Sequence, residues 1–227
     1  MVPLFKTHFS VGKSLLTPRR CFELAKDLEL PNIVFVEDSF GGFRKIQALS
    51  EEFEIQSVFG IQISAKQDNL SSKIVLVAKN NNGLRTIREI YSEAKLSEDS
   101  VWDINSFKGS LKDVKVCIPF FQSYLHKNIH EFGIHDIKLK DLTYFLENSD
   151  HPYSWEINRA ISKTGKCECL STKTILYETN ENFKEYQFYR SCCNRSGGKN
   201  PAFGRPELDD CGSDKFSWEE YKKCNNQ

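Results

Sequence analysis

The sequence predicts an α/β protein in which strands and helices alternate through one main domain and a short tail follows. Apolar runs typical of buried strands recur between segments that have helical spacing of apolar residues. A length of 227 residues suits a single α/β barrel. Turn-forming residues fill 196–201 and end the alternation. We therefore assign 1–195 to a barrel domain and 196–227 to a turn-rich linker and short C-terminal tail.

The first half of the chain supplies three strand-helix repeats. Thr17 is a suitable N-cap and Pro18 suits the first helical position. The run Asn-Asn-Asn-Gly at 80–83 breaks a strand before a helix. We expect strands at 33–36, 57–61 and 73–78, and helices at 18–28, 43–53 and 84–94. Repeated units of this kind imply a parallel sheet or barrel.

The second half continues the alternation less regularly. We expect strands at 114–119, 144–147 and 170–176, and helices at 157–164 and 181–193. In the tail, Ser217 and Glu220 have the spacing of a capping box, which predicts a short helix from Trp218 to Cys224.

Composition excludes several classes of protein. Lys and Arg total 31 and so do Asp and Glu, so the chain has no overall basic field for nucleic acid. No apolar run approaches the roughly 20 residues of a membrane span, and the start lacks a signal peptide. We expect a soluble, cytoplasmic protein with no membrane partner. Its eight cysteines are expected to be mostly reduced thiols, because nothing directs the chain to an oxidising compartment.

Several segments at predicted strand ends resemble, in order, the PHP (polymerase and histidinol phosphatase) domain, in the version found at the N-terminus of the bacterial DNA polymerase III alpha subunit. They are Leu4-Phe5-Lys6-Thr7-His8, Glu37-Asp38-Ser39, Val58-Phe59-Gly60-Ile61-Gln62, residues 76–84 and 91–94, Phe145-Leu146-Glu147 with His151, and Ser171-Thr172-Lys173. The resemblance covers residues 3 to 195 and implies a distorted (β/α)7 barrel with metal ions at the carboxyl ends of the strands. Active members of this family hydrolyse phosphoesters with those ions.

Aligned with the family motifs, this chain keeps some ligand positions. His8 survives from a His-x-His motif, Glu37 and Asp38 stand where a carboxylate is expected, and His151 matches a further ligand. The resemblance therefore implies that these four residues are the residual candidates for one or two divalent ions, zinc, manganese or iron.

The other ligand positions are lost. Lys6 replaces the first histidine, Gln62 replaces a glutamate, and Thr174 and Leu176 stand at a late Asp-x-His motif. We therefore expect no bound metal cofactor. Residues i and i+2 of a strand share a face, so we expect Lys6 to point the same way as His8. A cation about 4 Å from the Lys6 ammonium would be opposed by about 4 kcal/mol at an effective dielectric of about 20. Our hypothesis is that Lys6 replaces a metal ion and pairs with Glu37 or Asp38.

The leading interpretation is a stand-alone, catalytically degraded PHP-like domain that acts as an interaction or scaffold component of DNA replication, for example in a phage. Its expected partners are a polymerase core, an exonuclease or a clamp component. We expect no DNA polymerase activity from the chain by itself. The alternative is a weak metal-dependent phosphoesterase or 3'-5' exonuclease.

Two further features bear on partners. The tail aromatics Phe216, Trp218 and Tyr221 are candidates for a partner-binding anchor beyond a complete fold. A third interpretation is weak DNA binding through a local basic patch, which the neutral total charge disfavours. The patch would comprise Lys13, Arg19, Arg20, Arg85 and Arg88.

Overall fold

The structure is a computed structural model that describes residues 1–128, 139, 141–147, 154–163, 167–193 and 214–225. These residues form two compact units. Unit 1 contains Met1–Phe59 and the described residues from Thr172 onward, and unit 2 contains the described residues of 60–148 and 152–171. Strands β3 (Gln56–Gln67) and β8 (Glu168–Ile175) contribute residues to both units.

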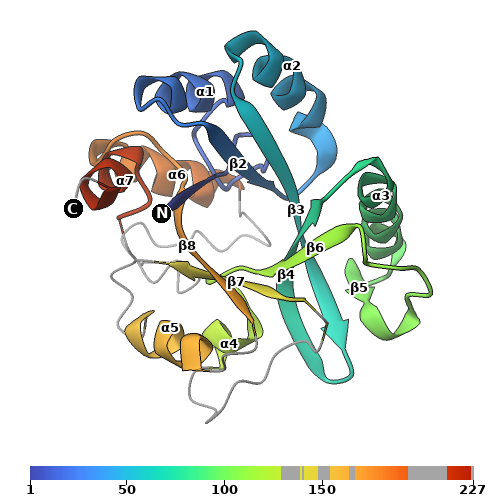
Figure 1. Cartoon of the computed structure of the whole chain (residues 1–227). Helices are drawn as coiled ribbons and strands as arrows, with labels where there is room; N and C mark the ends of the chain where they lie inside the picture. Colours follow the sequence, from blue (N-terminus) through green and yellow to red (C-terminus); the bar gives the residue numbers. More distant parts are fainter. Residues whose placement is uncertain (129–138, 140, 148–153, 164–166, 194–213, 226–227) are drawn as a thin grey trace. The chain divides into compact units, whose positions relative to one another are not determined.

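The strands pair in the order β2-β1-β8-β7-β6-β4-β3-β5, and β2 also pairs with β3. Seven strands therefore follow one another in a closed ring, and β5 is added at β3. The predicted α/β barrel of seven strands is confirmed in this strand order (Figure 1). The remaining strands are β1 (Val2–Phe5), β2 (Asn32–Glu37), β4 (Leu70–Ala78), β5 (Val101–Asp103), β6 (Val114–Ile118) and β7 (Thr143–Glu147).

The regular strand-helix repeat is broken where β4 follows β3 and where β6 follows β5, because no α-helix lies between the strands of either pair. β1 is parallel to β2 and β8, and β6 is parallel to β7, but β4 is antiparallel to both β3 and β6. Strands β3 and β4 form a hairpin in which Gln67 faces Leu70 across the turn Asp68-Asn69. Asp68 has φ +53°, which suits a two-residue hairpin turn. The expectation of an all-parallel sheet was therefore wrong at β4.

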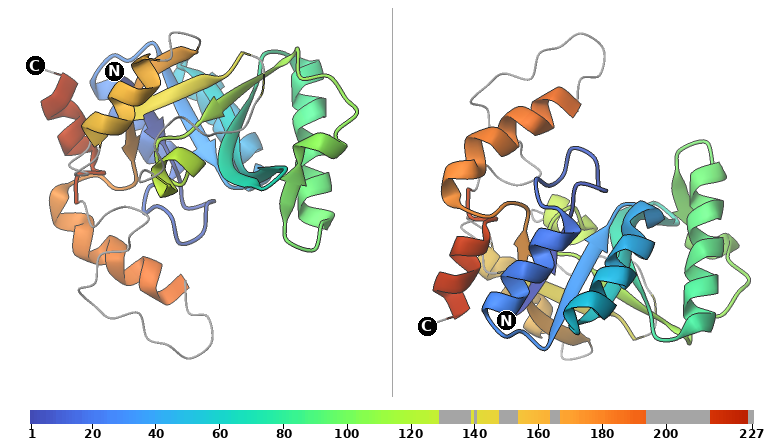
Figure 2. Two further views of the ribbon diagram at one scale, coloured as in Figure 1. Left: turned by 90° about the horizontal axis from the view of Figure 1, so that it is seen from below. Right: turned by 90° about the horizontal axis from the view of Figure 1, so that it is seen from above.

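All five helices expected before the tail are present. They are α1 (Pro18–Asp27), α2 (Phe43–Phe53), α3 (Asn81–Leu96), α5 (Ser154–Lys163) and α6 (Phe183–Cys193). The Thr17 side chain accepts a hydrogen bond from the Arg20 N–H, and Pro18 opens α1, as predicted. Figure 2 shows α1 and α2 side by side on unit 1. The short elements β5 and α4 (Tyr124–Lys127) were not predicted. None of the described helices is long and apolar enough to cross a membrane.

The core of unit 1 lies between β1, β2, α1 and the end of the chain. Phe5 and Phe35 from neighbouring strands and Phe22 from α1 are completely buried there. Their rings lie at centroid distances of 5.5 to 6.1 Å, in tilted arrangements that aromatic pairs favour. Burial of these large rings stabilises this unit, together with the aliphatic side chains packed around them.

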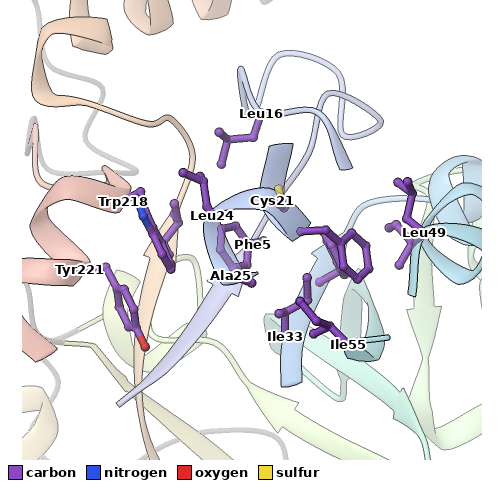
Figure 3. Close-up of a cluster of buried hydrophobic side chains, with 14 residues drawn as sticks. Phe5, Leu16, Cys21, Leu24, Ala25, Ile33, Leu49, Ile55, Trp218 and Tyr221 are labelled. Carbon is purple, nitrogen blue, oxygen red and sulfur yellow. The ribbon is translucent and has the colours of Figure 1, made fainter. Parts of the chain in front are cut away.

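The predicted tail helix exists as α7 (Trp218–Asn225), with the Ser217 hydroxyl accepting from the Glu220 N–H at 3.1 Å. However, the structure buries Phe216, Trp218 and Tyr221, which are 2%, 2% and 1% exposed. Trp218 lies 5.5 Å from Phe5, and the Tyr221 hydroxyl donates to the Met1 carbonyl. Figure 3 shows Trp218 beside Phe5 and Tyr221 beside Trp218. The three aromatics therefore have a packing role in place of the suggested role as an exposed partner anchor.

Backbone hydrogen bonds attach this tail to the end of β8. The Leu176 N–H donates to the Phe216 carbonyl at 2.8 Å, and the Trp218 N–H donates to the Tyr177 carbonyl at 3.0 Å. The Tyr177 hydroxyl donates to the Asp214 carbonyl at 2.6 Å. The tail is therefore an integral part of the unit 1 core.

We predict that Trp218→Ala lowers the free energy of unfolding by about 3 to 5 kcal/mol, because it leaves a cavity against Phe5. Urea unfolding measures the change. Phe188→Ala is the matched control, since Phe188 is 55% exposed and its truncation should change stability by less than about 0.5 kcal/mol. Equal effects of the two substitutions would contradict the packing role of the tail.

Candidate functional site

The candidate site lies in unit 1, where β1 and β2 end. β1 stops at Phe5, and the chain then turns: the Ser10 N–H donates to the Thr7 carbonyl and the Lys13 N–H to the Ser10 carbonyl. β2 ends at Glu37, and Asp38 follows it. Because the two strands are parallel neighbours, their carboxyl ends place Lys6, Thr7, Glu37 and Asp38 together.

The Glu37 carboxylate is the centre of a hydrogen-bond network with the loop after β1. Its Oε1 accepts from the Thr7 N–H at 3.0 Å and from the Thr7 hydroxyl at 2.6 Å. Its Oε2 accepts from the Ser10 hydroxyl. The Ser10 oxygen in turn accepts from the Asp38 N–H at 2.9 Å. Both carboxylate oxygens of a 0% exposed residue are therefore satisfied by protein donors.

Burial nevertheless dominates the electrostatics of Glu37. Desolvation raises the pKa of its carboxyl above the usual value, and the hydrogen bonds from Ser10 and Thr7 and the charge of Lys6 offset only part of that rise. Buried Cys21 on α1 has a strongly raised pKa, mainly through desolvation and further through the charge of Glu37. A thiol in that state is a structural residue, because the thiolate is the reactive form.

Lys6 forms an ion pair with Asp38. The distance between Lys6 Nζ and Asp38 Oδ1 is 2.7 Å, and the two side chains are 11% and 39% exposed. The hypothesis that Lys6 pairs with one of the two carboxylates is therefore confirmed in this structure. The partner is Asp38. Glu37 accepts hydrogen bonds from uncharged donors of the loop, and the Lys6 charge lowers the pKa of its carboxyl only as a lesser effect.

This arrangement does not fit the metal centre that the resemblance implies. A divalent ion would have to share Asp38 with an ammonium group at hydrogen-bond distance. It would also have to compete with three hydrogen-bond donors for the two Glu37 oxygens. Within the described ranges, no group of three or more His, Cys, Asp or Glu side chains is placed to hold an ion.

The structure places His8 differently from the expectation. The argument that Lys6 and His8 share one strand face does not apply, because β1 ends at Phe5 and His8 lies in a turn. The His8 side chain is exposed, and its ring stacks on Phe9 with centroids 4.5 Å apart. His151 lies outside the described residues.

The lost-ligand positions have structural roles. Thr174 is half-buried on β8, opposite Leu4 of β1. Leu176 is buried, and its carbonyl accepts from the Leu15 N–H and from the Ser14 hydroxyl, which anchors the loop after β1. Gln62 lies in unit 2 on β3, opposite Val75.

Sequence reasoning missed Thr7 and Ser10 as the donors that hold Glu37. Two hydroxyl residues shortly after a strand are common in loops, and nothing in their spacing identifies a carboxylate 27 to 30 residues later as the acceptor. The signal that could have found them is Glu37 itself. A glutamate at the end of an apolar strand is expected to be buried, and a buried carboxylate needs several hydrogen-bond donors.

Two residues of the basic patch suggested for DNA binding, Arg19 and Arg20 on α1, are paired with carboxylates. Arg19 makes a bidentate pair with Glu52, with N–O distances of 2.7 and 2.8 Å. Arg20 binds both Glu178 and Glu23. Guanidinium groups engaged in this way are less available for phosphates.

Comparisons with known proteins give no family for the chain. No family model matches it, and no curated protein matches it. Solved structures with partial similarity include a protein proposed to be a metal-dependent phosphoesterase from Bifidobacterium adolescentis, with 20% identity over 41% of this chain and 34% of that one and a TM-score of 0.32. Another is an amidohydrolase from Chromobacterium violaceum with bound sulfate and no metal, with 17% identity over 40% and 33% and a TM-score of 0.32. This chain thus matches about a third of each of those proteins, and we base no conclusion about chemistry on them.

We predict that Glu37 makes stability fall as pH rises above its ordinary pKa. Because the folded-state pKa is raised, the folded protein holds a proton that the unfolded chain has lost in the window above about pH 4.5. The contribution of Glu37 is therefore complete below that window and is lost as pH rises through the folded pKa. Glu37→Gln should remove this part of the pH dependence, measured by urea unfolding between about pH 4.5 and 8.

Glu52→Gln is the control for this measurement. Its carboxyl is exposed and has a lowered pKa beside Arg19, so its titration lies below the same window. If the free energies of unfolding of wild type and Glu37→Gln depend on pH in the same way, the folded-state pKa of Glu37 is not raised and the prediction is wrong.

We predict that Lys6 and Asp38 stabilise each other by about 1 kcal/mol in a double-mutant cycle of Lys6→Met and Asp38→Asn. The exposed pair Arg19 and Glu52, with side chains 49% and 51% exposed, should couple more weakly. The difference is expected because the Lys6 ammonium is more shielded from water. A coupling near zero at Lys6 would refute the fixed ion pair.

Proposed function

We propose that this chain is a non-catalytic binding module whose strand-end site holds a fixed network of charges in place of metal ions. The observation that carries the proposal is the Lys6 and Asp38 ion pair beside the fully hydrogen-bonded Glu37. Metal-assisted phosphoester hydrolysis needs cations that generate hydroxide and neutralise the reacting oxygens. An ammonium paired to the remaining carboxylate supplies neither a coordination site nor an activated water.

We further propose that the module serves DNA replication by binding a polymerase core, an exonuclease or a clamp component. The support is the ordered set of segments that resemble the PHP domain of a replicative polymerase, notably Leu4-Phe5-Lys6-Thr7-His8, Glu37-Asp38-Ser39 and Val58-Phe59-Gly60-Ile61-Gln62. A degraded site on a retained fold is consistent with selection for surface contacts more than for chemistry.

We place the proposed partner-binding surface outside the tail, because Phe216, Trp218 and Tyr221 are buried. Among the described residues, Trp155 on α5 is a better candidate: it is 65% exposed and the Arg159 guanidinium lies 5.0 Å from its ring centroid. Tryptophan and arginine are the residue types enriched at binding hot spots.

The proposal that the chain is not a metal-dependent enzyme is tested with purified protein. We predict that manganese or zinc neither raises the unfolding temperature nor stimulates cleavage of bis(p-nitrophenyl) phosphate or release of nucleotides from DNA. Metal-stimulated cleavage that is lost in both His8→Ala and Asp38→Asn would overturn it and establish a phosphoesterase or exonuclease.

The replication half is tested by affinity purification of the tagged full chain from its native host. Recovery of a polymerase core, exonuclease or clamp component that is reduced in Trp155→Ala supports it. Leu96→Ala is the matched control, because Leu96 is also highly exposed, at 87%, but lies on α3. Failure to recover any replication protein with wild-type bait would refute this half.

A further inference from the structure

The first turn of α3 contains a chemically reactive pair of residues that the proposed function does not use. Asn82 is followed by Gly83, and this is the one Asn-Gly pair in the sequence. Asparagine is labile because the backbone nitrogen of the next residue can attack its side-chain amide. Glycine shields that nitrogen least, since it has no Cβ. Asn82 is exposed, and among the described residues no group hydrogen-bonds to its side-chain amide.

Packing makes the glycine obligatory at this position. A Cβ added to Gly83 would lie 2.0 Å from the carbonyl oxygen of Asp113 and 2.9 Å from its carbonyl carbon. Both are backbone atoms, so no change of side-chain rotamer relieves the overlap. Helix α3 can approach the residue before β6 this closely only because residue 83 is glycine. The fold of unit 2 therefore requires the glycine half of the reactive pair.

The side chain of Asn80 caps the helix at the same point. Its Oδ1 accepts from the Asn82 N–H at 2.9 Å and from the Gly83 N–H at 3.0 Å. Its Nδ2 donates to Asp113 Oδ1 at 2.9 Å, which fixes the orientation of the cap. The N–H groups in the first turn of a helix have no partner within the helix, so Asn80 supplies the partner for the Gly83 nitrogen.

This geometry opposes ring closure between the two residues. Attack requires the Gly83 nitrogen to lose its proton and to be eclipsed with the Asn82 Cβ about the Cα–C bond of Asn82. A helical ψ of about −42° does not give that conformation. The hydrogen bond to Asn80 also engages the proton that has to leave. The first turn of α3 must therefore open before the reaction can proceed.

We propose that Asn82 is a deamidation site whose reactivity is controlled by the Asn80 cap. When the turn opens, the Gly83 nitrogen gives its proton to hydroxide and forms a bond to Asn82 Cγ. The Cγ–Nδ2 bond breaks, and ammonia leaves with a proton taken from water. Water then adds to one carbonyl of the succinimide ring, which opens to aspartate or isoaspartate. The net reaction consumes one water, releases one ammonia and changes no oxidation state.

The two products act differently on α3. Aspartate adds a negative charge near the positive end of the helix dipole, which favours the helix. Isoaspartate carries the main chain through the former side-chain carboxyl carbon, so it lengthens the backbone between Asn80 and Gly83 by one carbon. Gly83 then cannot keep both its hydrogen bond to the cap and its close contact with Asp113. Isoaspartate at this position therefore loosens the start of α3.

The test is peptide mass spectrometry of the full chain after incubation at neutral pH. Loss of a helix cap favours the open turn about fivefold, so Asn82 should deamidate about fivefold faster in Asn80→Ala than in wild type. Thr17→Ala is the matched control, because it removes the same kind of cap from α1 in unit 1 and should leave the rate at Asn82 unchanged. Equal rates in wild type and Asn80→Ala, or equal acceleration by Thr17→Ala, would overturn the proposal.

A second measurement compares the folded with the unfolded protein. In concentrated urea the cap is absent, so Asn82 should deamidate faster than in native buffer and at the same rate in wild type and Asn80→Ala. A rate in urea no higher than the native rate would overturn the control by the fold. A difference between the two proteins that persists in urea would overturn the role of the cap, because it would come from the local sequence. Neither result depends on whether the strand-end site is catalytic.

Discussion

The buried Glu37 carboxylate determines the local structure of unit 1 more than any other polar group. A carboxylate without solvent contact is stable in a fold only if donors surround it. Thr7 and Ser10 supply those donors, and the loop that carries them must therefore close over the end of β2. That loop continues to Ser14 and Leu15, which bind the Leu176 carbonyl. One desolvated group thus links the ends of β1, β2 and β8.

The same network explains why Lys6 and Asp38 are paired. Asp38 directly follows Glu37, and its N–H donates to the Ser10 hydroxyl, whose own O–H donates to Glu37. Lys6 directly precedes Thr7. Fixing Thr7 and Ser10 on Glu37 therefore brings the neighbouring charged residues to one place with little further loss of conformational entropy. The ion pair is a consequence of the buried carboxylate, and its own contribution to stability is smaller.

The sequence predicted those parts of the fold that local patterns specify. Thr17 and Pro18 identified the start of α1, and Ser217 identified the start of α7. Strand β5 and helix α4 were missed because three or four residues carry no measurable periodicity. The hairpin at Asp68 was missed because a two-residue turn can be recognised only when the strands on both sides of it are known to pair with each other.

The candidate site was predictable in its charges and not in its contacts. A pairing of Lys6 with either Glu37 or Asp38 could be predicted because opposite charges at neighbouring strand ends attract one another, but the choice of Asp38 came only from the structure. The placement of His8 failed because the sequence does not show that β1 ends at Phe5, three residues before His8, so that His8 lies outside the strand. The tail aromatics were misassigned for a related reason: exposure depends on the rest of the fold, and Phe5 leaves an apolar surface that only the returning chain covers.

Burial of the tail also constrains where function can reside. Trp218 and Tyr221 complete the core beside Phe5, so any change that removes them acts first on folding and only then on binding. A loss of partner binding on truncation of 214–227 would therefore not identify an interface. Exposed residues such as Trp155 separate the two effects, because their truncation leaves the core intact. If the chain binds a partner as we propose, exposed residues of the α/β fold are better tests of that interface than its terminal segment.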